Sequence, residues 1–392
     1  MQKNKKVKMR RKFVWIFSVF GILLIALGVY FGIYCTKKEA NKIIPLPPIK
    51  EEKPKKVETE ASIIMVGDAL IHGTVYNAAR VSNGSFDFKP MLDKIKPIVQ
   101  KYDLAYYNQE TILGGTQLGL SNYPRFNSPF EVGDAFLDTG FNMVSLASNH
   151  TMDKGVSGVK NSLDYWSDKK AYTAGSYSSF EERDKKVIKE VNGIKYSFLS
   201  YTVWTNGLVP PKGEEYLDNI YSDELAKADI ERVREEADVV MVAMHWGTEY
   251  SLGVSEQQLK IANYLSSLGV DIIIGAHPHV VEPITFIGKT LVIYSLGNLI
   301  SDQEGTERLT GLMAAVTINK TVENNITTIS LKDVKADLVY THSSYTTKRN
   351  FKVYPYQELN NTILANYMTF NDKYKKVVLS MDQSNLITWG IS

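Results

Sequence analysis

Residues 239–281 read VVMVAMHWGTEYSLGVSEQQLKIANYLSSLGVDIIIGAHPHVV, and this stretch contains the unit on which the fold is built. Its two apolar runs, Val239–Met244 and Asp271–Ile274, have the length of buried strands. Between them, Glu256–Leu268 has the apolar spacing of an amphipathic helix. A strand, a helix and a second strand in this order predict an α/β domain with parallel strands.

The same alternation extends along the chain on both sides of this unit. Ser255 and Gln258 have the spacing of a capping box, which predicts that the helix begins after Ser255. From about Thr310, alternating segments predict antiparallel strands that complete the sheet, followed by a helical tail from about Tyr356 to Val378. The other predicted elements are the strands Ser62–Val66, Asp103–Tyr107, Asn142–Leu146, Tyr196–Ser200 and Leu291–Tyr294 and the helix Asp223–Ala237.

Polar residues suited to metal binding or proton transfer come just after these apolar runs. Because ligands bind at the carboxyl ends of the strands in open α/β sheets, we expect five strands to bring these side chains to one cleft. All the histidines except His342 belong to this set. Its members are Asp68, His72, Asn108, Glu110, Asn149, His150, His245, His277 and His279.

The chemistry of this set indicates a metal site. Carboxylate, amide and imidazole ligands without cysteine suit Mn, Fe or Zn. His277 and His279, with a rigid proline between them, can approach one ion from the same loop. Two neighbouring dications need an anionic ligand between them, and Glu110 or Asp68 can supply it. Each acid alone also fits a solvated loop; it is the co-occurrence of the clusters that favours the metal site.

Asn149 and His150 suggest acid–base chemistry beside the metal. His150 is placed to protonate a leaving group, and Asp153 to fix its tautomer through the other ring nitrogen. An ordinary helix N-cap is the alternative for Asn149, because asparagine is a favoured cap. The sequence has neither a G-x-S-x-G nor a P-loop motif, and its one cysteine, Cys35, is far from the histidines.

The first 60 residues predict an anchor and a spacer. Residues 1–12 carry seven Lys or Arg and no acid, and residues 13–35 carry no charge and are numerous enough to cross a bilayer. A cleaved secretory signal is the alternative, but no convincing cleavage site ends the apolar run. Residues 36–60, rich in Lys, Glu and Pro, predict an extended spacer. The basic cluster places the N-terminus in the cytoplasm and the rest outside.

Composition excludes several classes of protein. With 44% hydrophobic and 22% charged residues, the chain is neither disordered nor a multi-span membrane protein. A single cysteine excludes an internal disulfide framework. The segments before Ala61 carry more positive charge than the whole chain, so the remainder is net acidic, which argues against nucleic-acid binding.

Taken in order, these motifs resemble the CapA family, also called PgsA, of poly-γ-glutamate capsule biosynthesis proteins. The similarity covers about Ser62 to Asp302. This family is in turn similar to calcineurin-like metallophosphoesterases, which implies a four-layer α/β sandwich with a dinuclear metal site. The motifs are Gly67-Asp68, Asn108-x-Glu110, Ser148-Asn149-His150-x-x-Asp153-x-Gly155, His245-Trp246-Gly247-x-Glu249-Tyr250, Gly275-x-His277-Pro278-His279-Val280 and Ser295-Leu296-Gly297-Asn298.

The resemblance also implies roles for individual residues. His150 would be the general acid and Asp153 its orienting partner. Phosphoesterases usually place this aspartate and histidine two residues apart, whereas Asp68 and His72 are four apart, which leaves His72 outside the ligand set. Glu282 stands where relatives usually have Gln. The implied metal ligands are Asp68, Glu110, Asn149, His245, His277 and His279, and the residues assigned to substrate binding are Asn108, Glu249 and Asn298.

We therefore expect a membrane-anchored component of poly-γ-glutamate synthesis or export, with a metal-binding domain outside the cell. Its expected partners are the synthetase and membrane subunits and the anionic polymer. The alternatives are an extracytoplasmic metal-dependent phosphoesterase and a non-catalytic scaffold. The expected segments are a cytoplasmic basic segment (1–12), a transmembrane helix (13–35), a spacer (36–60), the CapA-like domain (61–310) and C-terminal strands and a helix that complete it (311–392).

Overall fold

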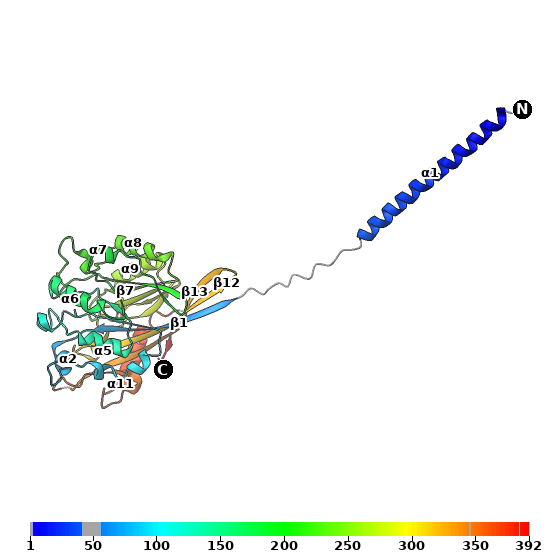
Figure 1. The fold of residues 1–392 in the computed structure, drawn as a ribbon. Coiled ribbons are helices and arrows are strands. Elements are labelled where there is room, and N and C mark those ends of the chain that lie inside the picture. The colour runs from blue at the N-terminus through cyan, green and yellow to red at the C-terminus, as the bar shows by residue number, and fades with distance from the viewer. Residues whose placement is uncertain (1–2, 41–55, 345, 384, 392) are drawn as a thin grey trace. The chain divides into compact units, whose positions relative to one another are not determined.

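The computed structural model describes residues 3–40, 56–344, 346–383 and 385–391, and the chain forms two units that divide after Lys55 (Figure 1). The first unit contains α1 (Lys3–Ala40). Within it, Trp15–Lys38 is long and apolar enough to span a membrane, a property that a signal sequence shares. Residues 36–40 are helical and not extended, so the predicted spacer is wrong there; its residues 41–55 lie outside the described part of the chain.

The second unit alternates strands and helices. Its strands are β1 (Val57–Ala69), β2 (Leu104–Asn108), β3 (Met143–Ser145), β4 (Tyr172–Ala174), β5 (Lys189–Val191), β6 (Ile194–Thr202), β7 (Val239–His245), β8 (Ile272–Ala276), β9 (Ile284–Ile287), β10 (Thr290–Ile293), β11 (Asn298–Ile300), β12 (Thr310–Glu323), β13 (Ile326–His342), β14 (Lys352–Pro355) and β15 (Thr388–Trp389). Its α-helices are α2 (Gly73–Ala78), α3 (Lys89–Leu92), α4 (Lys96–Val99), α5 (Glu131–Thr139), α6 (Gly155–Ser167), α7 (Phe180–Arg183), α8 (Asp223–Arg234), α9 (Glu256–Ser267), α10 (Thr306–Leu309) and α11 (Tyr367–Val378).

The strands form two sheets, as the four-layer sandwich implied by the family resemblance requires. The first has the order β14-β13-β12-β1-β2-β3-β4, and the second the order β5-β6-β7-β8-β10-β9. Strands β1 to β4 are parallel neighbours, as are β6, β7, β8 and β10. The predicted strand–helix–strand unit is therefore β7, α9 and β8 of the second sheet.

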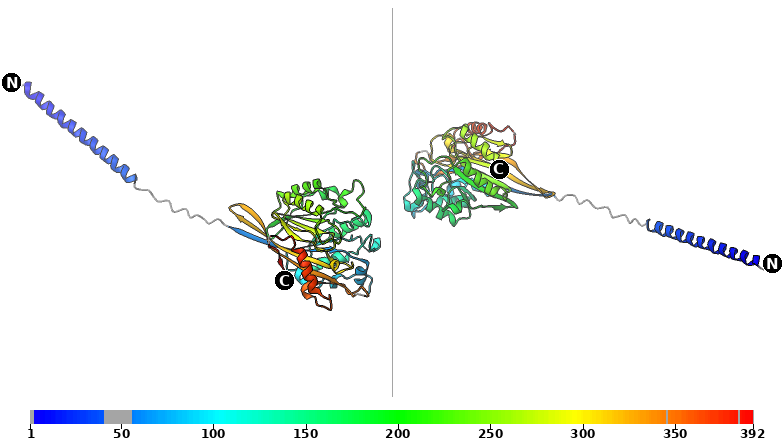
Figure 2. Two further views of the ribbon diagram at one scale, coloured as in Figure 1. Left: turned by 180° about the vertical axis from the view of Figure 1, so that it is seen from behind. Right: turned by 90° about the horizontal axis from the view of Figure 1, so that it is seen from above.

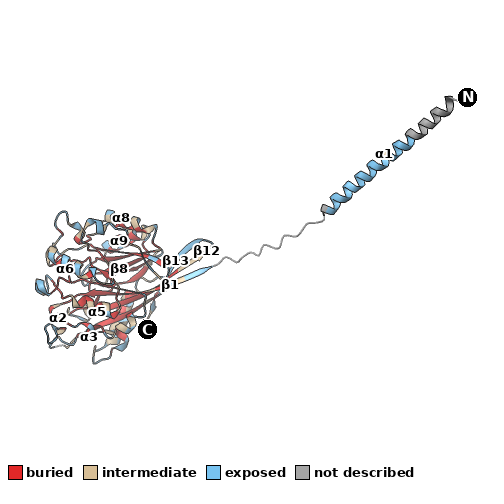
Figure 3. Cartoon of the chain, viewed as in Figure 1, coloured by how far each residue is buried: buried red, intermediate tan, exposed pale blue. Residues whose placement is uncertain are grey.

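Alternating side chains on each strand explain why the sheets stack. On β1, Ile63 and Met65 belong to a core shared by both sheets, whereas Ile64 and Val66 belong to a core on the outer face. On β7, Met241 lies in the shared core and its neighbours face α8 and α9. Strands that are buried on both faces read as continuous apolar runs. The result is helix, sheet, sheet and helix, the predicted four-layer α/β sandwich (Figures 1 and 3).

Strand β1 begins earlier than the sequence analysis placed it. Residues 57–60, assigned to the spacer, pair with β12, from Val57 opposite Val322 to Glu60 opposite Asn319. With the β12–β13 hairpin they form an arm that extends from the body of this unit (Figure 2).

The predicted C-terminal helix is correct only in its second half, α11. Asn360 accepts a hydrogen bond from the backbone N–H of Thr362 at 2.9 Å, and Asn361 accepts one from Asn366 at 3.0 Å. Such local side-chain bonds compete with helix formation. Asn366 itself is left-handed, with φ of 59°, and α11 begins after it.

The predicted capping box at the start of α9 is present and ties the helix to a buried acid. Gln258 completes the box with Ser255, and its Nε2 donates to Glu282 Oε2 at 2.5 Å. Glu282 is fully buried, and its Oε1 has no partner among the described residues. Burial raises the pKa of Glu282 to about 8.

We predict that Glu282→Gln stabilises the protein increasingly with rising pH. The folded chain holds the Glu282 proton up to about pH 8, whereas an unfolded chain releases it near the ordinary pKa of 4.5, so wild-type stability falls across this window. Since the amide does not titrate, the gain should grow by up to about 1.4 kcal/mol per pH unit and reach roughly 2–4 kcal/mol at pH 8. Urea denaturation from pH 5 to 8 measures it. Glu235→Gln, at an exposed position, is the control, and equal pH profiles for the two variants would contradict the prediction.

Candidate metal centre

The candidate site lies where strand ends of both sheets meet. Asp68 and Asn108 are at the ends of β1 and β2, and His245 ends β7. Close approach of the backbone is required here: the N–H of Asp68 donates to the carbonyl of Gly297 at 2.9 Å, and a Cβ on Gly67 would overlap that carbonyl. Glycine before Asp68 thus lets the strand end reach the site.

Two groups of buried donors converge here, and they share one residue. Glu110, His245 and His277 form one group, and Asp68, Glu110 and His279 form the other. Within each group the donor atoms lie within 4.8 Å of one another. Glu110 is therefore the acid common to both groups, and it is one of the two residues, with Asp68, predicted as the bridging acid.

The first group has an amide oxygen beside its imidazoles. His245 Nε2 lies 3.1 Å from His277 Nδ1, 2.9 Å from Asn149 Oδ1 and 3.9 Å from Glu110 Oε1. Trp204 stacks on His277 with 6.4 Å between ring centroids, and its Nε1 donates to the Gly247 carbonyl. Nitrogen, carboxylate and amide donors around one point suit a transition metal.

The second group is tied to neighbouring amides. His279 Nδ1 lies 3.4 Å from Asp68 Oδ2, and its Nε2 lies 3.5 Å from Glu110 Oε1. Asn108 Nδ2 donates to Asp68 Oδ1 at 2.9 Å, and Asn298 Oδ1 lies 3.0 Å from His279 Nδ1. These amides fix the orientation of a carboxylate and of an imidazole.

The loop that carries both histidines is conformationally strained. His277 and His279 have φ of 97° and 58°, which residues other than glycine rarely adopt. The protein holds this backbone in place on each side, since Tyr250 N–H donates to the carbonyl of Pro278 and the N–H of His277 lies 3.4 Å from Asp68. Strain of this kind is typical of functional sites.

Buried charge makes this site suited to a cation. Glu110 is fully buried and neither carboxylate oxygen has a hydrogen-bond partner among the described residues. Burial raises its pKa well above the ordinary value, while His279 acts against this shift. Burying an unpaired carboxylate costs several kcal/mol, which a bound cation would offset. The donors present therefore fit a divalent metal.

The histidines have different protonation states. Burial and the neighbouring imidazoles lower the pKa of His245 well below its ordinary value and that of His277 to about 3, so both are neutral, as metal ligands must be. At His279, burial acts in the same direction, but Glu110 and Asp68 outweigh it and raise the pKa to about 9. A metal here would displace the His279 proton.

His150 and Asp153 form the pair that the sequence predicts. His150 Nδ1 lies 2.7 Å from Asp153 Oδ2, which also accepts the backbone N–H of Phe126 at 2.6 Å. The Phe126 ring contacts His150 edge-on at 4.8 Å between centroids. Both members are buried, and the carboxylate fixes the orientation of the imidazole through Nδ1, so Nε2 is the ring nitrogen that Asp153 does not engage.

The three residues assigned to substrate binding occupy different places. Glu249 is exposed beside Tyr250. Asn108 is fully buried and its amide is bonded to Asp68. Asn298 is also fully buried, and its Nδ2 faces the Arg308 carbonyl at 2.8 Å and Gln303 Oε1 at 2.9 Å, so its geometry is that of a positioning residue.

Other residues at the site escaped the sequence analysis or were left outside it. His72 lies at the edge, where its Nδ1 accepts the Asp302 N–H at 3.2 Å and its ring meets Phe126 edge-on. Burial lowers the pKa of His72 to about 4. Arg308 and Trp204 also border the site; neither belongs to a motif, and no pattern in the sequence signals them.

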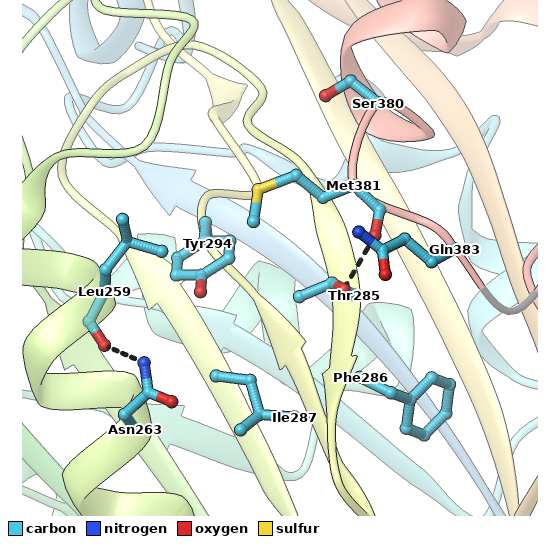
Figure 4. Close-up of a pocket in the computed structure, with 9 residues that line it drawn as sticks. All are labelled: Leu259, Asn263, Thr285, Phe286, Ile287, Tyr294, Ser380, Met381 and Gln383. Atoms are coloured by element: carbon cyan, nitrogen blue, oxygen red, sulfur yellow. Dashed lines mark hydrogen bonds between the residues drawn. The ribbon is translucent and has the colours of Figure 1, made fainter.

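A separate cavity of about 310 Å³ lies between α9, β9 and the segment after α11 (Figure 4). Thr285 Oγ1 donates to the Met381 carbonyl at its rim. Its described lining includes no histidine or carboxylate, so it is not part of the metal centre. The lining residues are Leu259, Asn263, Thr285, Phe286, Ile287, Tyr294, Ser380, Met381 and Gln383.

Solved structures to which the chain is similar include a putative 5'-nucleotidase from Staphylococcus aureus in complex with alpha-ketoglutarate. It is 15% identical, with a TM-score of 0.46, over 81% of this chain and 58% of that one. A 5'-nucleotidase from Candida albicans has a TM-score of 0.40 and is 12% identical, over 67% of this chain and 51% of that one.

Sequence comparisons assign the family. The PGA biosynthesis protein CapA of Bacillus subtilis is 33% identical over 180 residues, which is 43% of this chain and 45% of that protein. The capsule biosynthesis protein CapA of Bacillus anthracis is 30% identical over 181 residues, 45% of this chain and 44% of that protein. The chain thus matches less than half the length of these relatives. A family model described as bacterial capsule synthesis protein PGA_cap matches residues 62–303, which include both donor groups, so the chain belongs to the PGA_cap family of capsule synthesis proteins.

Proposed function

We propose that this protein is a membrane-anchored component of poly-γ-glutamate synthesis or export whose extracytoplasmic domain works through a two-metal centre. The observation that carries the proposal is the pair of buried donor groups that share Glu110, located in the part of the chain that matches the capsule family. The apolar segment Trp15–Lys38, preceded by basic residues, supports the anchor. The proposed partners are the synthetase and membrane subunits and the anionic polymer.

The proposed metal ligands are the residues of the two donor groups together with Asn149. When bound, two divalent ions, Mn, Fe or Zn, supply Lewis-acid chemistry and a water-derived nucleophile. Around them the chain supplies neutral imidazoles at His245 and His277 and a shared carboxylate at Glu110. Asn298 holds the His279 ring through Nδ1, which leaves Nε2 toward Glu110.

His150 is proposed as the proton donor and Asp153 as the residue that positions it. The 2.7 Å contact places the proton-bearing Nδ1 on the carboxylate, and the edge of Phe126 limits rotation of the ring. Such a buried pair favours a catalytic domain over a purely structural scaffold. A phosphoesterase would use the same pair, so the two candidate functions, action on the polymer and hydrolysis of a phosphate ester, differ in their substrate. Full-length protein with Mn²⁺, assayed on a poly-γ-glutamate chain and on an aryl phosphate, decides between them.

We predict that Glu110→Gln abolishes the stabilising effect of metal. In chelator the variant should unfold at the wild-type temperature or above, because a buried carboxylate is removed. Added Mn²⁺ should raise the melting temperature of wild type but not of the variant, since a ligand that binds only the folded state stabilises it. Elemental analysis should find two ions per wild-type chain. Asp218→Asn is the control, because Asp218 is also a buried acid but lies outside both donor groups. Full metal occupancy in Glu110→Gln would contradict the shared-ligand assignment.

We predict that His150→Ala separates chemistry from structure. Removal of a general acid typically lowers the rate about 10²- to 10⁴-fold with little effect on binding. The variant should keep its metal content and lose polymer production well beyond any loss of folded protein, since removal of the imidazole also leaves the buried Asp153 without this partner. Asp153→Asn should show a milder loss. His342→Ala, which removes a histidine outside the site, should behave as wild type. A metal-loaded, fully functional His150→Ala protein would favour the scaffold.

We predict that the anchor is retained and that the N-terminus lies inside. Seven basic residues before an uncharged run hold the N-terminal side in the cytoplasm. Protease added to intact cells should remove a C-terminal tag and leave an N-terminal tag on a small fragment. Mature protein in the medium that starts near Thr36 would instead show a cleaved signal.

A further inference from the structure

Arg308 is a cation without a carboxylate partner at the border of the metal centre. Among the described residues no acid lies within ion-pair distance of it, and its Nε is buried without a hydrogen-bond partner. The residue as a whole is half-buried, so part of its surface is exposed to solvent. A guanidinium presents a planar set of donors that match an oxyanion, and leaving them unpaired is costly.

Two contacts fix Arg308 beside the metal-binding residues. Its guanidinium lies over the ring of Tyr250 at 4.8 Å from the centroid, and the same ring lies 6.0 Å from the ring of His279. Its backbone carbonyl accepts Asn298 Nδ2 at 2.8 Å, while the oxygen of the same amide lies 3.0 Å from His279 Nδ1. One asparagine therefore fixes both a proposed ligand and the backbone of Arg308.

The charges around Tyr250 show that these groups act on one another. Burial raises the pKa of Tyr250, Glu249 and Glu110 add to the shift, and Arg308 opposes it. Tyr250 has φ of 66° and is 46% exposed, so its ring faces both the guanidinium and solvent.

We propose that Arg308 binds a carboxylate group of the polymer next to the candidate metal centre. The inference rests on the proposed function and adds the residue that recognises the polymer. A single guanidinium matches the single charge of a carboxylate and can bind it through two hydrogen bonds. Tyr250 positions the guanidinium through its ring face.

The test is binding of a fluorescent γ-linked glutamate oligomer to full-length protein in detergent with Mn²⁺. Arg308→Gln should bind the oligomer at least about 10-fold more weakly than wild type, because a charge-assisted hydrogen bond is lost. Arg308→Lys should be intermediate, since it keeps the charge but not the planar donors. Metal content and melting temperature should be unchanged in both variants, which separates this effect from damage to the centre.

Arg80 provides a matched control, because its guanidinium also lies over an aromatic ring, 4.7 Å from the centroid of Phe86. Arg80→Gln should bind the oligomer as wild type does. If Arg308→Gln also does so, the proposal is wrong while the proposed function stands. If metal-loaded wild type binds no oligomer, inorganic phosphate is the second probe. If phosphate binds and Arg308→Gln weakens that binding, Arg308 recognises phosphate and not a carboxylate. If wild type binds neither probe, both the recognition role and the proposed substrate are wrong.

Discussion

A fully buried carboxylate, Glu110, is the constraint around which this structure is organised. Neither of its oxygens has a hydrogen-bond partner among the described residues, so its charge must be neutralised by a proton, by the His279 imidazolium or by a bound cation. The imidazolium comes from the loop after β8 in the second sheet, and both donor groups that could hold a cation include a histidine from that sheet. The packing of the two sheets therefore determines the chemistry of the site, because the acids of the two donor groups come from the first sheet and their histidines from the second.

Because residues of both sheets must meet at the site, the structure needs both the core between the sheets and close packing at the strand ends. The core between the sheets sets the distance at which the end of β1 meets the ends of β7 and β8. Gly67 and Gly275 let the strand ends lie against neighbouring carbonyls, where any side chain would overlap. The strained backbone at His277 and His279 costs conformational free energy. Burial of the apolar layers on the outer faces of the two sheets offsets this cost.

Sequence reasoning predicted what is local and missed what depends on three-dimensional packing. The strand ends at Asp68 and His245 follow from apolar runs that stop at polar residues. The division into two sheets was predicted only through the family resemblance. A strand that faces a sheet on one side and helices on the other is apolar throughout, as Ile63 and Ile64 show, so its residues do not reveal to which sheet it belongs. Arg308 was missed because its place at the site depends on tertiary packing. Its carbonyl accepts a hydrogen bond from Asn298, and no sequence pattern predicts this contact.

Strand β1 has a mechanical consequence. It runs from Val57, the first strand residue after the segment 41–55, to Asp68 in the metal centre, and Val57–Val66 pairs with β12 residue by residue. The hydrogen bonds of an antiparallel ladder are perpendicular to the strands. Tension applied to the chain before Val57 would therefore load this ladder in shear, with many bonds sharing the force at once, rather than peel them one by one. A pull on the chain before Val57 would reach Asp68 only after the whole ladder had yielded.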